Sequence, residues 1–72
     1  MRKILADEFL NKSTIVIVPH WKHEGTFALY GITKEVTDSH LVLQSYNRQK
    51  MNLIPLEDII QIAVDKNPRE VR

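Results

Sequence analysis

The chain has 72 residues, no cysteine, and ten basic against nine acidic residues, which leaves a formal net charge of +1. This length allows one domain over 1–72, and the missing cysteine excludes disulfides and cysteine-based metal sites. A dedicated nucleic-acid binder usually carries a clear basic excess, which is absent here. The longest apolar stretch, IVIV, is far shorter than the about 20 residues of a membrane span, and no signal-peptide pattern is visible. A cytoplasmic protein without membrane contact is therefore expected.

Residues 2–12, RKILADEFLNK, have apolar spacing that fits one face of a short helix. The residues on that face are Ile4, Leu5, Phe9 and Leu10. A helix of two or three turns is marginal alone, so this face is expected to dock on the rest of the domain. Residues 14–18, TIVIV, are almost all β-branched and predict a strand that is apolar on both faces.

Residues 19–25, PHWKHEG, contain a proline and a glycine and predict a loop before a long strand at 26–36. Gly31 interrupts that strand. The apolar residues before it, Phe27 and Leu29, share a face, and those after it have the opposite parity. A change of parity at a glycine predicts a bulge or sharp bend, where a strand leaves one sheet and enters another.

The second half of the chain predicts three more short strands separated by turns, at 41–46, 50–54 and 59–64. Pro55 ends the middle one because it cannot donate to a ladder, and 56–58 form a tight turn. In a small barrel the last strand pairs with the first, so 59–64 is expected beside 14–18, buried on both faces. The predicted fold is mainly β: a five-stranded barrel over 14–64, a helix at 2–12 and a loose tail at 65–72.

Two stretches carry a resemblance to a known family: GTFALYGITKEVTDSHLVL (25–43) and IPLEDIIQI (54–62). They resemble the two motifs of the Sm-like proteins, an SH3-like small-barrel superfamily. GITKEVTD (31–38) together with IPLEDIIQI is closer still to the YolD-like proteins, small bacterial and phage relatives of that fold. The resemblance implies a bacterial or phage accessory protein without catalytic residues. It also implies a homo-oligomer, because Sm-like barrels form rings through strand pairing.

The chain departs from the Sm pattern at the RNA site. The family's asparagine falls at Val42, and its arginine–glycine pair falls at Pro55 and Leu56. In Sm proteins those residues form the uridine pocket, and only His40 remains, at the position that stacks on the base. The resemblance therefore implies a barrel without a complete RNA site.

Trp21 and Lys22 form the first candidate site, in the loop at 19–25. A tryptophan beside a base stacks on a nucleobase, anchors a protein partner, or covers the core. His20 and His23 flank this pair, but two histidines without a third ligand do not predict a metal site.

A second candidate lies in the turn after 41–46, where Tyr46 and Arg48 suit either a phosphate contact or an ordinary solvated hairpin. Glu57 and Asp58 are read as turn-forming residues, because adjacent carboxylates on a tight turn diverge. No nucleophile elbow or phosphate loop is present, so neither enzyme activity nor a cofactor is expected. The favoured function is a non-catalytic module that binds a protein partner or itself. The alternative is single-stranded nucleic-acid binding through Trp21, His40 and Arg48.

Overall fold

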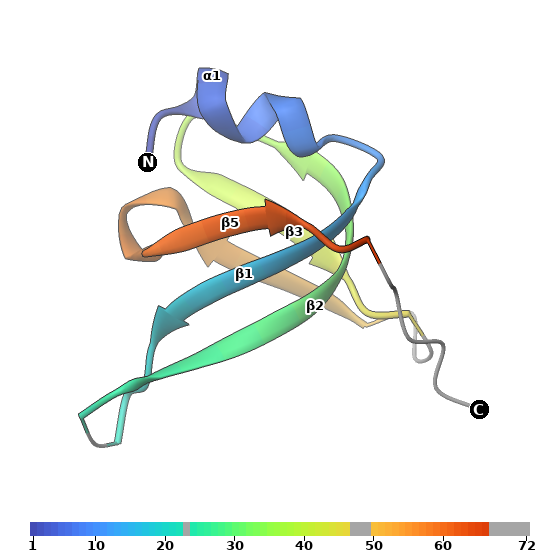
Figure 1. Ribbon diagram of the computed structural model, residues 1–72. Helices are drawn as coiled ribbons and strands as arrows, with labels where there is room; N and C mark the ends of the chain where they lie inside the picture. The colour runs from blue at the N-terminus through green and yellow to red at the C-terminus, as the bar shows by residue number, and fades with distance from the viewer. Residues whose placement is uncertain (23, 47–49, 67–72) are drawn as a thin grey trace.

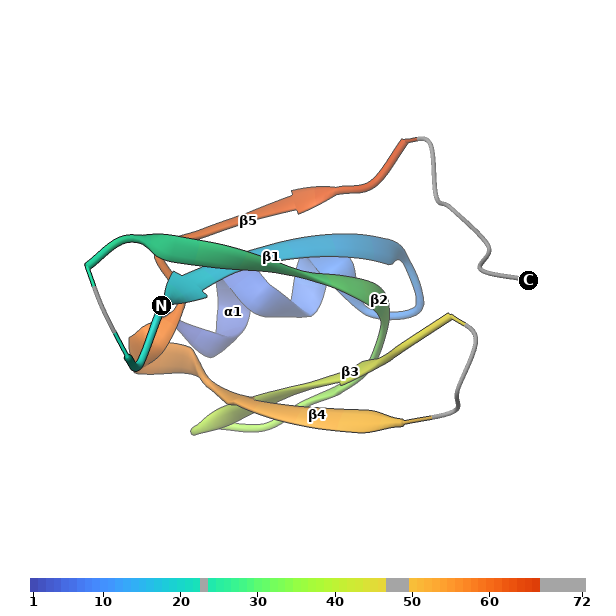
Figure 2. The same ribbon diagram turned by 90° about the horizontal axis from the view of Figure 1, so that it is seen from below.

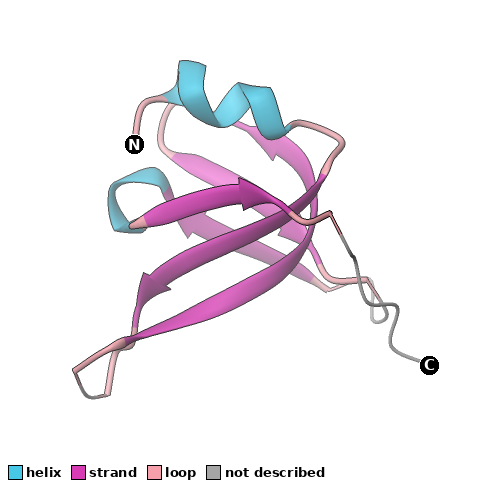
Figure 3. Cartoon of the chain, viewed as in Figure 1, coloured by secondary structure: helices cyan, strands magenta, loops and turns pink. Residues whose placement is uncertain are grey.

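The protein is a five-stranded antiparallel sheet with a short helical segment at its N-terminus (Figures 1 and 3). The computed structural model describes residues 1–22, 24–46 and 50–66. The strands are β1 (Ser13–Pro19), β2 (Thr26–Val36), β3 (His40–Gln44), β4 (Met51–Pro55) and β5 (Gln61–Val64). The helical elements are α1 (Lys3–Ala6) and the 3₁₀ turns η1 (Asp7–Phe9) and η2 (Leu56–Asp58). The mainly-β prediction and all five strand positions are confirmed to within a few residues.

The first and last strands lie side by side, as predicted. β1 and β5 pair antiparallel, with Val16 opposite Ile62. The sheet order is β4-β3-β2-β1-β5, so β1 is an internal strand and β5 is an edge. Among the described residues β4 and β5 are not paired, so the predicted closed barrel is corrected to an open sheet with two free edges. The prediction that β5 is buried on both faces is also wrong: Val64 is exposed and Ile62 is only half-buried.

The sheet bends within β2 and folds into two layers, with β5, β1 and the first half of β2 facing β3 and β4 (Figure 2). Ile32 is the turning point, since it lies opposite Ser13 of β1 and opposite Gln44 of β3. The register shifts between Thr33 and Glu35, which places the bulge three residues after the predicted position.

Gly31 has a different role from the predicted bulge. A Cβ built on it would lie 2.2 Å from the Gln44 carbonyl oxygen, so only glycine lets the backbones of β2 and β3 approach this closely. The backbone needs a glycine at the bend, and the extra residue of the bulge lies further along the same strand, between Thr33 and Glu35.

The core fills the space between the two layers and is built from eight buried apolar side chains. They are Ala6, Val16, Val18, Leu41, Leu43, Ile54, Leu56 and Ile59. Two buried threonines join them, with the Thr14 and Thr33 hydroxyls 2.8 Å apart and Thr14 Oγ1 donating to the Lys12 carbonyl at 2.7 Å. Each hydroxyl therefore has a partner, which makes its burial tolerable.

The N-terminal segment lies across one open end of the two layers (Figures 1 and 2). It enters the core through Ala6, which is fully buried, whereas Ile4 is 72% exposed and Leu5 is 51% exposed. The predicted apolar docking face is therefore wrong. The α-helical part has only four residues and tightens into a 3₁₀ turn, so side chains four and five apart do not share a face. A small residue lets the segment approach the sheet closely.

Candidate functional site

The residues predicted to bind a partner are spread over the sheet. Trp21 and Lys22 lie in the β1–β2 loop, and His40 begins β3. Tyr46 lies at the other end of β1, because its hydroxyl bonds to Asp65, whose amide bonds to the start of β1. Arg48 and His23 lie outside the described residues. The described candidates therefore do not form a single site.

Trp21 is the centre of an aromatic cluster at the tip of the β1–β2 loop. Its ring stacks on His20 with centroids 4.7 Å apart and planes at 8°, and both rings meet Phe27 edge-on at 5.5 Å. The His20 amide donates to the Gly25 carbonyl at 3.0 Å, which closes the loop. The Lys22 amide donates to His20 Nδ1 at 3.1 Å and fixes the orientation of the imidazole. Trp21 remains 73% exposed, so it does not serve as a buried cover of the core.

A cavity of about 380 Å³ opens beside this cluster. Its wall combines the loop aromatics with residues of β4 and η2, among them Leu53, Pro55 and Asp58. Since Asp58 was predicted only as a turn former, its place at this cavity is a feature that sequence reasoning missed. The cavity joins two stretches of the chain that are distant in sequence, 18–29 and 53–58, and no local pattern in either stretch signals it.

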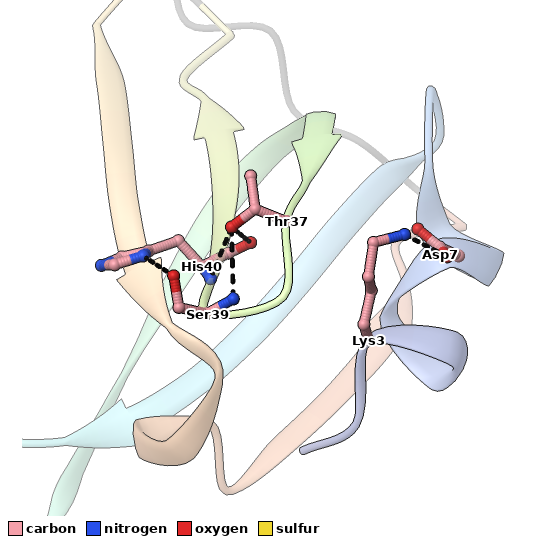
Figure 4. A network of polar contacts seen from close by, with 5 residues as sticks. All are labelled: Lys3, Asp7, Thr37, Ser39 and His40. Atoms are coloured by element: carbon pink, nitrogen blue, oxygen red, sulfur yellow. Dashed lines mark hydrogen bonds and ion pairs between the residues drawn. The ribbon is translucent and has the colours of Figure 1, made fainter.

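His40 lies next to a second cavity of about 430 Å³, whose wall includes Asp38 and Glu57. Figure 4 shows its ring beside Ser39, whose Oγ lies 2.7 Å from His40 Nδ1. Thr37 Oγ1 accepts the His40 amide at 2.9 Å and so closes the tight turn before β3. The N-terminal ammonium of Met1, which donates to the Leu56 carbonyl at 3.0 Å, offsets one of these two carboxylates. The negative charge that remains is unfavourable for an RNA phosphate near the predicted stacking residue.

Tyr46 connects the end of β3 to the end of β5. Its hydroxyl donates to Asp65 Oδ2 at 3.2 Å. Burial is the main reason that the pKa of Tyr46 is raised above its ordinary value, and the charge of Asp65 acts in the same direction, while a hydrogen bond with Ser13 opposes both. A hydroxyl held by a carboxylate is poorly placed to contact a phosphate.

A further charged contact joins α1 to η1. Lys3 Nζ lies 2.9 Å from Asp7 Oδ2 (Figure 4), and this hydrogen bond raises the pKa of Lys3. Across 1–22, 24–46 and 50–66, no group of three or more His, Cys, Asp or Glu side chains is placed to hold a metal ion.

The free edges of the sheet are the second feature that sequence reasoning missed. On β4 the Leu56 and Lys50 backbone groups bond to β3, so in an antiparallel ladder the Met51 and Leu53 amides point to the free edge. Pro55 occupies the next free-edge position, where its lack of an N–H costs nothing. Met51 is 48% exposed and Leu53 66% exposed, although their alternation in sequence equally suits an inward face.

The edge at β5 has the same character. The Asp65 amide bonds to the Ser13 carbonyl of β1, so alternation directs the Val64 amide outward. Val64 is 42% exposed and Ile60, just before the strand, is 58% exposed. Within 1–22, 24–46 and 50–66, both edges thus carry outward-facing donors that no neighbouring strand pairs, flanked by apolar side chains.

Comparisons with protein-family models, with curated proteins and with solved structures found no match to this chain. Within the described ranges, no helix has the length and apolar character needed to cross a membrane. The function is therefore inferred from the surface itself.

Proposed function

We propose that this protein is a non-catalytic interaction module, an Sm-like small-barrel relative of bacterial or phage origin that binds itself or a protein partner by strand addition. The observation that carries the proposal is the pair of free edges at β4 and β5. Unpaired backbone groups on an edge strand are a template for pairing with another chain, and proteins that do not use them usually block them with charges. Leu53 on β4 and Val64 on β5 are uncharged, and Pro55 removes a donor only at the end of β4.

Support for the Sm-like assignment comes from the topology. The two stretches that carry the resemblance, 25–43 and 54–62, contain the glycine at the bend of β2 and the one-turn link between β4 and β5, and a short N-terminal helix precedes the strands. Strand pairing between the β4 edge of one copy and the β5 edge of the next would generate a closed ring or an open filament.

The test is sedimentation velocity over a range of protein concentrations, compared with the chain mass of 8.4 kDa. Val64→Pro removes an outward-facing donor and should shift the protein toward the monomer. Val64→Thr is the matched control, because it shortens no strand and keeps the donor, and it should associate like the wild type. A wild type that stays monomeric at high concentration would contradict self-association. Strand addition by a different protein would then be the remaining form of the proposal, and it would be tested by measuring the binding of extended peptides to the protein.

Single-stranded nucleic-acid binding is the second candidate, and the exposure of Trp21 is the observation in its favour. It predicts salt-sensitive binding that is lost in Trp21→Ala. The carboxylates near Trp21 and His40 weigh against it.

A further inference from the structure

The cavity beside Trp21 has a composition that selects its ligand. We propose that it receives an arginine side chain presented by a partner protein. The cavity borders the free edge of β4, because Leu53 and Pro55 belong to both, but the proposed arginine contacts are made by Trp21 and Asp58.

Aromatic surface is the first requirement, and it is met by the cluster of the β1–β2 loop. Trp21 and Phe27 both line the cavity, and Trp21 is 73% exposed, so the indole can be covered by an incoming group. His20 supports the indole by stacking on it at 4.7 Å. A planar guanidinium stacks on such a ring and gains cation–π attraction.

Charge is the second requirement. Asp58 lines the same cavity as Trp21, and none of the described residues in its wall is Lys or Arg. Asp38 and Glu57 lie on the neighbouring cavity, which shares Pro55 with the first, and the Met1 ammonium on that cavity offsets only one of the two. Negative charge on this side favours a cation and disfavours the phosphates of a nucleic acid.

Arginine fits this combination better than lysine. Its guanidinium is flat, remains charged at any physiological pH and donates two parallel hydrogen bonds to one carboxylate. Lysine offers a compact and strongly hydrated charge that satisfies Asp58 but gains less from stacking on Trp21.

The experiment uses the full chain and a blocked arginine, N-acetyl-arginine methylamide, as the probe. Trp21 is the only tryptophan, so its fluorescence and its indole N–H resonance report directly on the cavity. The blocked citrulline analogue has nearly the same shape as blocked arginine but no charge. Blocked lysine has the charge but lacks a planar group that could stack on the indole. We expect a saturable shift with millimolar affinity for arginine, weaker binding of lysine, and at least about tenfold weaker binding of citrulline.

Asp58→Asn should weaken arginine binding about tenfold and leave citrulline binding unchanged. Glu35→Gln removes an exposed carboxylate of β2 that does not line the cavity, and it should bind like the wild type. If Asp58→Asn fails to fold by circular dichroism, the ratio of arginine to citrulline affinity in the wild type decides.

Equal affinities for arginine and citrulline, or no saturable shift with arginine, would overturn the proposal. A Trp21 shift with a short oligothymidylate at low salt, without one for arginine, would overturn it in favour of nucleic-acid binding. Sedimentation of the same samples reports on the edges independently, so a failure here is distinguishable from a failure of the proposed function.

Discussion

Replacing Gly31 by alanine tests the bend on which the two-layer arrangement depends. Gly31 lies opposite Thr14 of β1, one residue before β2 begins to pair with β3. The added Cβ would lie 2.2 Å from the carbonyl oxygen of Gln44 and 2.8 Å from its carbonyl carbon. Both atoms belong to the backbone, so no side-chain rotation relieves the clash, and β3 must move away from β2.

The size of the effect follows from two contributions. Forcing an extra carbon into a packed site costs about 1–3 kcal/mol. Displacing Gln44 also weakens the ladder hydrogen bonding at the start of the β2–β3 pairing, which adds about 1 kcal/mol. The sum, about 2–4 kcal/mol, is a large share of the about 4–11 kcal/mol expected for a domain of this length. The melting temperature should fall by at least about 8 °C.

Urea denaturation followed by circular dichroism measures this loss. Gly25→Ala is the informative comparison, since a Cβ there meets nothing within 4 Å and the only cost is its φ of +113°, about 1–2 kcal/mol. Thr26→Ala, at an exposed position of β2, should change the free energy of unfolding by less than about 0.5 kcal/mol. A loss below about 1 kcal/mol for Gly31→Ala would refute the close approach of β2 and β3.

Three further predictions concern the core and its rim. Thr14→Val leaves the buried Thr33 hydroxyl without its partner and should cost about 1–3 kcal/mol of stability. Thr33→Val should cost less, because the Thr14 hydroxyl still donates to the Lys12 carbonyl. Equal losses in urea denaturation would contradict this assignment of donor and acceptor. The pKa of Tyr46 is raised above 10.0, so above that pH the folded state keeps a proton that the unfolded chain releases, and the free energy of unfolding should fall. In Tyr46→Phe this fall should be smaller. Equal falls in the wild type and the variant would contradict the prediction. In thermal denaturation, Ile4→Ala should change stability by less than about 0.5 kcal/mol, because Ile4 is exposed, whereas Ala6→Leu should cost about 1–3 kcal/mol, because Ala6 is fully buried. A larger loss for Ile4→Ala than for Ala6→Leu would show that α1 packs by its other face.

The strands were predictable because their signals are local. The β-branched run at 14–18 fits a pleated strand, and Pro19 and Gly25 limit the loop after it. Pro55 was recognised as the end of β4, and the one-turn link with buried Leu56 was also confirmed. Each of these features depends on a few neighbouring residues, whose conformational preferences agree with the fold.

The errors arose where distant segments decide the outcome. Alternation at Met51 and Leu53 shows that they share a face, but it does not say whether that face meets the core or solvent. The apolar run ending in Val64 predicts a strand buried on both sides, whereas among the described residues β5 pairs only with β1. Whether a fifth strand closes a barrel depends on its distance from the fourth, a property of the whole bend and not of either segment.

The candidate site illustrates the same limit for charge. A formal net charge of +1 describes the whole chain and argues only weakly against nucleic acid. Folding brings Asp58 to the wall that holds Trp21, and places Asp38 with Glu57 on the adjacent cavity. Asp38 precedes Asp58 by 20 positions in the chain, yet the two carboxylates line adjacent cavities, where like charges favour the approach of a cation. An end of the sheet with exposed aromatic surface and clustered negative charge is therefore suited to a basic partner, even though the chain as a whole is nearly neutral.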